Sequence, residues 1–138
     1  MTGGDGVRLA AWLFAALALF VGAFHLAAIC GAPVGHLTMG GRWPGVLPPA
    51  ARLLSALSMG LILLLAFVVL ARAGVIDRSI PGWGMRAVLG YLAVAIPTHV
   101  ATPSAGERKL WLPVILALMA SALWVELKAP HGGRGAGQ

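Results

Sequence analysis

The segment Gly31–Arg52, GAPVGHLTMGGRWPGVLPPAAR, is the longest break between apolar runs and decides the fold. One apolar run, Leu9 to Cys30, comes before it, and another runs from about Arg52 to Ala71. Each is close to the 20 or so residues that a helix needs to cross about 30 Å of hydrocarbon. Pro48 and Pro49 suit the start of a helix, because proline is tolerated in the first turn. The segment therefore predicts a long connection between two antiparallel membrane helices.

The composition excludes an ordinary soluble protein. The chain has 138 residues, of which 59% are hydrophobic and 10% charged, whereas soluble domains carry about 25% charged residues. Its formal charge of +6 comes from arginines and lysines that lie mainly at the ends of apolar runs, where they meet lipid headgroups. We therefore expect membrane lipids, and no nucleic acid, as partners. A single cysteine cannot form an internal disulfide.

The sequence predicts one all-α domain, an integral membrane four-helix bundle. We expect spans at about residues 8–30, 52–71, 84–101 and 105–127, after a short polar start at residues 1–6. The third span is the weakest, because Arg86, Pro97 and His99 interrupt its apolar character. The glycine-rich residues 129–138 are expected to form a disordered tail.

Small residues mark one face of the first span. Ala11, Ala15, Ala18, Gly22 and His25 recur at spacings of three and four, which places them along one stripe of a helix. Such a stripe lets a neighbouring helix approach closely. We therefore expect His25 to point into the bundle.

The start of the fourth span has a helix-capping pattern. Ser104 and Glu107 have the spacing of a capping box, in which each side chain accepts a backbone N–H. Glu107 is also expected to pair with Arg42, Arg52 or Arg108. At the other end of the same span, Glu126 is expected to pair with Arg72 or Lys128.

Four spans place both termini on one side of the membrane. The basic residues on the side of the termini are six: Arg8, Arg72, Arg78, Arg86, Lys128 and Arg134. The opposite side has four: Arg42, Arg52, Arg108 and Lys109. The excess predicts cytoplasmic termini by the positive-inside rule, with residues 31–52 forming a structured lid on the outer side.

This topology gathers the candidate site in the outer half of the bundle. The candidate ligand-binding residues are His25, Arg42, Trp43, Arg52, His99 and Glu107. Ionisable groups at membrane depth are costly and often functional. Simpler roles stay open for each of them. The histidines can hydrogen-bond serine, threonine or backbone carbonyls across helices, Trp43 and the arginines can sit at headgroup depth, and Glu107 can serve as a cap.

Two functional classes remain open. The favoured one is a non-catalytic subunit, scaffold or binding protein for a small ligand or lipid, without a cofactor. The other is an electron-transfer subunit in which His25 and His99 hold haem or a metal, or in which a quinone occupies the same pocket. No HExxH, P-loop, nucleophile elbow or CxxC motif occurs, so no catalytic residue is predicted and a non-enzymatic role is favoured.

Two segments carry a family resemblance. GGRWPGVLPPAARLLSALSMGLILLLA and THVATPSAGERKLWLPV resemble a group of small bacterial four-helix membrane proteins with a GxWPG-like loop and a TPSxxERxxWxP segment. More remotely, the architecture is similar to that of DoxX-type proteins, some of which are membrane subunits of redox complexes. The resemblance implies a fold and a location in the bacterial inner membrane, and leaves open a membrane protein partner or a homo-oligomer.

Overall fold

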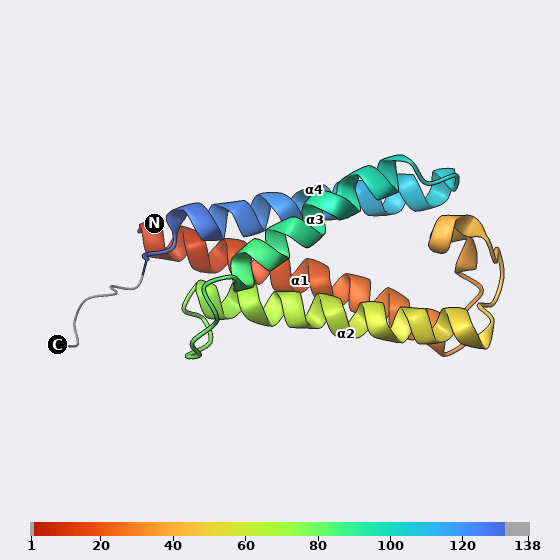
Figure 1. Cartoon of the computed structure of the whole chain (residues 1–138), viewed down its shortest axis with the longest axis horizontal. Helices are drawn as coiled ribbons and strands as arrows, with labels where there is room; N and C mark the ends of the chain where they lie inside the picture. The colour runs from red at the N-terminus through yellow and green to blue at the C-terminus, as the bar shows by residue number, and fades with distance from the viewer. Residues whose placement is uncertain (1, 132–138) are drawn as a thin grey trace.

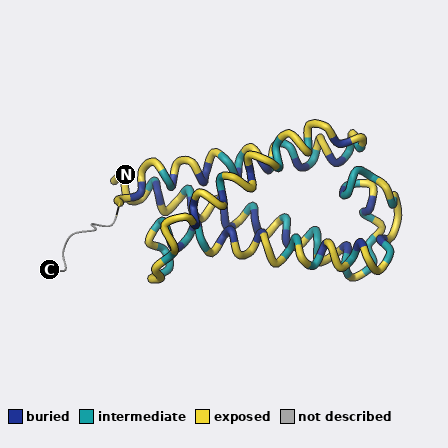
Figure 2. The backbone as a smooth tube through the Cα atoms, viewed as in Figure 1, coloured by how far each residue is buried: buried dark blue, intermediate teal, exposed yellow. Residues whose placement is uncertain are grey.

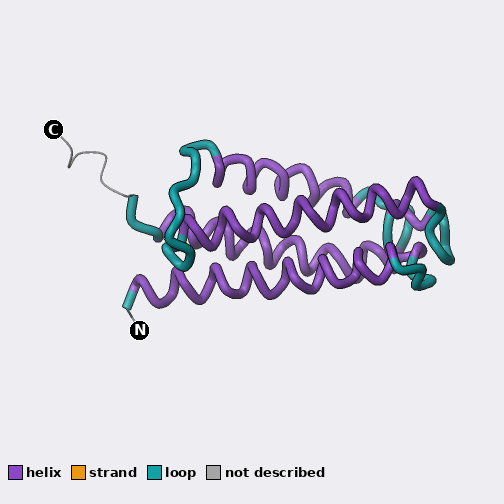
Figure 3. The backbone as a smooth tube through the Cα atoms, turned by 90° about the horizontal axis from the view of Figure 1, so that it is seen from below, coloured by secondary structure: helices purple, strands orange, loops and turns teal. Residues whose placement is uncertain are grey.

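A computed structural model describes residues 2–131 of the chain. Within these residues the chain forms four α-helices: α1 (Gly3–Ile29), α2 (Pro49–Arg72), α3 (Gly84–Val100) and α4 (Ala105–Lys128). Two short 3-10 helices, η1 (Gly35–Leu37) and η2 (Met39–Gly41), lie between α1 and α2. The helices run alternately up and down, with connections at both ends of the bundle (Figures 1 and 3). The prediction of an all-α, four-helix fold is confirmed.

The helix boundaries differ most from prediction at the beginning of the chain. α1 begins at Gly3, not after a polar start that extends to residue 6. Thr2 and Asp5 form a complete capping box, in which the Thr2 hydroxyl accepts from the Asp5 N–H and the Asp5 carboxylate accepts from the Thr2 N–H. These caps satisfy backbone donors that a helix start otherwise leaves without partners. Local capping therefore extends the helix beyond its apolar run.

Three helices, α1, α2 and α4, are long and apolar enough to cross a membrane. α3 has 17 residues, which at 1.5 Å per residue gives about 26 Å, less than the roughly 30 Å hydrocarbon core. Its prediction as a fourth full span is therefore not met by length. Many large apolar side chains on α1, α2 and α4 are exposed, and exposed positions follow the outside of these helices in Figure 2. An extensive apolar exterior of this kind suits a lipid environment.

The helices do not form a symmetric bundle. α1 packs along both α2 and α4, and α3 packs mainly against α4. Contact between α2 and α3 is limited, and Gly84 at the start of α3 lies against Val68 of α2. From that point α3 leans away from α2 (Figure 1). The two helices are therefore separated at the end of the bundle where the α1–α2 connection lies.

We call the two ends of the bundle the terminal end and the lid end. The terminal end is where α1 begins and α4 finishes (Figure 1). Its core is closely packed, and the large side chains with almost no exposure there are Val7, Phe14, Val69, Val88 and Val125. The small residues Ala11, Ala15, Ala18 and Gly22 are buried as predicted, and Gly22 faces Met59 and Leu63 of α2.

Polar contacts also tie the terminal end together. Arg72 on α2 forms an ion pair with Glu126 on α4, with 3.0 Å between Nε and Oε2, so the prediction of this partner is confirmed. The same guanidinium donates to the carbonyls of Ala129 and Pro130. Ala129 is buried, so Ala129 and Pro130 are held against α2, whereas the sequence predicted a disordered tail from residue 129. The rest of that predicted tail lies outside the described residues.

The lid, residues 31–48, folds back over the lid end and is fastened to the start of α4. The Gly40 N–H donates to Glu107 Oε2 at 2.8 Å, Ser104 Oγ donates to the His36 carbonyl at 2.6 Å, and Trp111 Nε1 donates to the Leu37 carbonyl at 2.6 Å. Gly40 has φ +71°, a left-handed conformation that glycine adopts without strain. The predicted structured lid beside the α3–α4 turn is confirmed.

Candidate functional site

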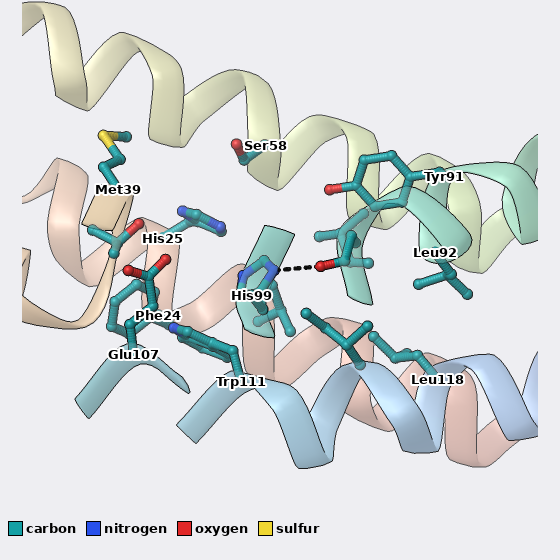
Figure 4. Close-up of a pocket in the computed structure, with 15 residues that line it drawn as sticks. Phe24, His25, Met39, Ser58, Tyr91, Leu92, His99, Glu107, Trp111 and Leu118 are labelled. Atoms are coloured by element: carbon teal, nitrogen blue, oxygen red, sulfur yellow. Dashed lines mark hydrogen bonds between the residues drawn. The ribbon is translucent and has the colours of Figure 1, made fainter. Parts of the chain in front are cut away.

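A cavity of about 220 Å³ lies beneath the lid. All four helices and the lid contribute to its walls, and Figure 4 shows the side chains around it. Pockets for drug-sized ligands have about 300–1,000 Å³, so this cavity suits a smaller molecule or a headgroup. The lining residues are Val21, Phe24, His25, Thr38, Met39, Ser58, Ile62, Tyr91, Leu92, Ala95, His99, Glu107, Trp111, Ile115 and Leu118.

His25, near the end of α1, presents a buried nitrogen without a partner. Its Nδ1 is inaccessible to solvent and makes no hydrogen bond within the described residues. A buried polar atom normally has a partner, because leaving it unpaired costs about 1–3 kcal/mol. The predicted hydrogen bond from this ring to a hydroxyl or carbonyl of another helix is absent from the described structure. His25 contributes to the cavity wall, but its Nδ1 has no exposed surface there.

His99, near the end of α3, has one ring nitrogen already engaged. Nδ1 lies 2.8 Å from the carbonyl oxygen of Ala95, one turn earlier on the same helix. A carbonyl can only accept, so Nδ1 carries the hydrogen, and Nε2 of the neutral ring is an acceptor. The imidazole is thus held by its own helix and not by a neighbouring helix as the sequence suggested. His25 and His99 point into the same space (Figure 4).

Glu107, in the first turn of α4, is a buried carboxylate at the cavity wall. It is 7% exposed. Oε2 accepts hydrogen bonds from the Gly40 N–H and the Thr102 hydroxyl, both at 2.8 Å, and Oε1 has no hydrogen bond within residues 2–131. In the described part of the chain the carboxylate has no basic partner, since the ion pair found there joins Arg72 and Glu126. The predicted pairing of Glu107 with an arginine is therefore wrong.

The arginines at the lid end are engaged elsewhere. Arg52 donates to the carbonyls of Leu47 and Ile29, and so ties the start of α2 to the end of α1. Arg42 lies over the Trp43 ring, 5.0 Å from its centroid, and Arg108 donates to the Thr102 carbonyl. Each guanidinium satisfies a local backbone or aromatic group, which offsets the cost of ordering a long side chain.

The structure thus divides the predicted site residues into two sets. His25, His99 and Glu107 line one cavity, whereas Arg42, Trp43 and Arg52 do not.

The predicted capping box of Ser104 and Glu107 is only half formed. The Ser104 hydroxyl accepts from the Glu107 N–H, while the Glu107 side chain reaches the lid and the Ser104 N–H donates to Thr102 Oγ1.

Several cavity residues escaped the sequence prediction. Phe24 and Trp111 form an aromatic wall, with centroids 4.7 Å apart and an edge-to-face geometry. Tyr91 and Ser58 add hydroxyl groups from α3 and α2, and neither hydroxyl has a hydrogen-bond partner in the described structure. The available signal was the position of the single tyrosine about two helical turns before His99 on the same helix.

The cavity wall includes residues of both α2 and α3. Tyr91 of α3 lines the cavity and is 42% exposed, and Ser58 lines it from α2. α3 leans away from α2 toward the lid end of the bundle (Figure 1). Tyr91 therefore belongs both to the cavity wall and to the exposed surface of the bundle.

Comparisons of this chain with known proteins found no relative. No protein-family model, no curated protein and no solved structure matches the chain. Within residues 2–131, no group of three or more His, Cys, Asp or Glu side chains lies close enough to hold a metal ion. The arrangement that remains is a small, mostly apolar cavity with a carboxylate, two imidazoles and three hydroxyl-bearing side chains on its walls.

Proposed function

We propose that this chain is a multi-pass protein of the bacterial cytoplasmic membrane that binds a small ligand or lipid headgroup in the cavity beneath the lid. The observation that supports the proposal is a cavity whose wall holds the Glu107 carboxylate, with an Oε1 that has no hydrogen bond within the described residues, together with the imidazoles of His25 and His99. A ligand that donates a hydrogen bond to this oxygen supplies a partner that the described residues do not. Without a catalytic motif, we infer a binding or subunit role.

The apolar exterior and the charge distribution support the location. Three helices have the length and composition of membrane spans, and α3, packed on α4, completes the bundle. The basic residues expected on the side of the termini outnumber those on the lid side, which by the positive-inside rule supports a cytoplasmic terminal end. The lid and the cavity then lie in the outer half of the membrane.

The test is purification in a mild detergent followed by mass spectrometry of small molecules that accompany the protein. Ala95 lines the cavity, so Ala95→Phe fills space that the ligand occupies. Ala93 on the same helix is exposed, which makes Ala93→Phe a matched control of equal size. We expect a stoichiometric small molecule with the wild-type protein and with Ala93→Phe, and its loss from Ala95→Phe. Equal retention by both variants contradicts the proposal.

A second candidate function is electron transfer. It is favoured by the two imidazoles in one cavity, where His99 Nε2 is an acceptor with no hydrogen-bond partner in the described structure. A metal ion bound by these rings, or a quinone ring bound by the hydroxyls of Tyr91 and Ser58, suits the volume. A haem, which is larger than most drug molecules, requires the helices to move. An absorption spectrum and a metal analysis of the purified protein distinguish this candidate, because it requires a haem band, a stoichiometric metal or a quinone.

A further inference from the structure

Two hydrogen-bond acceptors in the cavity wall have no partner in the described structure. Glu107 contributes a carboxylate with an unbonded Oε1, and His99 contributes Nε2, which is an acceptor in the neutral ring because Nδ1 donates to the Ala95 carbonyl. No lysine or arginine lines the cavity. The hydroxyls of Thr38, Ser58 and Tyr91 can donate or accept. A ligand that satisfies Glu107 Oε1 and His99 Nε2 must therefore supply donors.

The Glu107 carboxylate also favours a ligand with a positive charge. Glu107 is almost completely buried, and a buried carboxylate is stable when it is hydrogen-bonded and paired with a positive charge. Its two hydrogen bonds both reach Oε2, from neutral donors of the lid and of the α3–α4 turn. A cation in the cavity supplies the missing partner at Oε1. An anionic or purely accepting ligand meets repulsion there.

The aromatic walls suit the same kind of ligand. Phe24 and Trp111 lie edge to face on one side of the cavity, and Tyr91 lies on another (Figure 4). Ring faces attract ammonium groups, an interaction that strengthens when water is excluded. The rest of the cavity lining is largely apolar and includes Val21, Ile62 and Leu118, so a ligand that has an apolar portion next to its ammonium group suits the cavity.

We propose that the cavity binds the primary ammonium group of an amphipathic amine, with Glu107 as its counter-ion and Phe24, Trp111 and Tyr91 as its aromatic surround. This inference rests on the proposed ligand-binding function and specifies its ligand class. A primary ammonium has three N–H donors, for which Glu107 Oε1, His99 Nε2 and a hydroxyl oxygen of Ser58 or Tyr91 are acceptors in the wall. The same chemistry is present in an ethanolamine lipid headgroup and in a free alkyl amine.

The first test compares three probes with the same twelve-carbon chain. Dodecylamine, dodecanol and dodecanoate are titrated against the full chain in a neutral detergent, and bound molecules are counted by native mass spectrometry. The common alkyl chain keeps the apolar contribution to binding similar, so the polar head group determines the order of the affinities. We expect dodecylammonium to bind most tightly, dodecanol more weakly and dodecanoate least. Equal binding of all three, or a preference for dodecanoate, overturns the inference without requiring any variant to fold.

The second test removes the charge alone. Glu107→Gln keeps a side-chain oxygen that accepts from the Gly40 N–H and the Thr102 hydroxyl, so the lid stays fastened. Breaking a buried charge pair costs about 2–5 kcal/mol, so dodecylammonium should bind at least about 30-fold more weakly. Glu126→Gln removes a carboxylate outside the cavity and should leave binding unchanged. Equal effects of the two substitutions contradict the role of Glu107.

The two sources of the ammonium group are distinguished by lipid. In nanodiscs, phosphatidylethanolamine competes with dodecylamine if the lipid headgroup is the ligand, and phosphatidylglycerol does not. If neither lipid competes, the ligand is a free amphipathic amine. If dodecanol or dodecanoate binds in a manner that Ala95→Phe blocks, the ligand-binding function stands and the ammonium inference fails. If no probe binds and no small molecule accompanies the protein, both fail.

Discussion

At the terminal end, Phe14, Val69 and Val125 are completely buried, and Arg72 and Glu126 neutralise each other. At the lid end, His25 and Glu107 lack part of their hydrogen bonds or a counter-charge, and a cavity separates the helices. Unsatisfied polar groups and empty volume both reduce stability. The contrast indicates that the terminal end holds the fold together, whereas the lid end retains features that packing alone does not explain.

The largest expected effect tests the terminal end. Phe14 is fully buried, so Phe14→Ala removes a large side chain from a closely packed core and should cost about 3–5 kcal/mol of stability. Phe67 is 41% exposed on the apolar surface, and Phe67→Ala should cost much less. Thermal unfolding in detergent, followed by circular dichroism, measures both. Equal losses would show that the terminal end is not the more tightly packed part.

An intermediate effect is expected in the lid. A Cβ on Gly35 would collide with the carbonyl of Trp43 and crowd that of Gly45, so Gly35→Ala should displace the lid and cost about 1–3 kcal/mol, as overpacking does. Gly45 has open space around its Cα, which makes Gly45→Ala the control. Hydrogen exchange of the lid amides is the measurement. Faster exchange only in Gly35→Ala is expected, and unchanged exchange would mean that the close contact does not hold the lid.

The smallest effect is expected from the ion pair at the terminal end. Arg72 and Glu126 have partly exposed side chains, and pairs of this kind contribute about 0–1 kcal/mol. Glu126→Gln keeps an oxygen that accepts from the Arg72 N–H, so the unfolding temperature should change little. Because Arg72 also donates to the Ala129 and Pro130 carbonyls, Arg72→Gln should be the more damaging substitution. The reverse order would show that the ion pair, and not the held C-terminal segment, is what Arg72 stabilises.

The sequence predicted best those features that depend on a single helix or on residues close together in the chain. Apolar runs of membrane length predicted α1, α2 and α4, and glycine and proline predicted the lid. Ser104 and Glu107 predicted the start of α4, although the Glu107 side chain turned to the lid. The partner of a long or flexible side chain depends on which elements are adjacent in space, and spacing along the chain does not contain that information. This is why Glu107 met Gly40 and Thr102 in place of an arginine.

The candidate site was predictable only in part for the same reason. His25, His99 and Glu107 were identified because ionisable groups are rare in apolar helices, and topology placed them at one end. Tyr91 and Ser58 were not, because each is compatible with ordinary packing until the lean of α3 away from α2 is known. Arg42 and Arg52 do not line the cavity, and local carbonyls and the Trp43 ring satisfy them; whether they bind a ligand stays a prediction.

By itself, the sequence determined that this chain is a helical bundle with an apolar exterior, because hydrophobic runs, caps and breakers act over short distances. It also determined that Gly31–Arg52 is the principal connection. Only the tertiary structure decided that this connection folds over a cavity, that Glu107 lines it without a basic partner, and that His99 offers Nε2 as an acceptor. These properties arise from contacts between residues as far apart as Gly40 and Glu107, and such contacts exist only when the helices have packed.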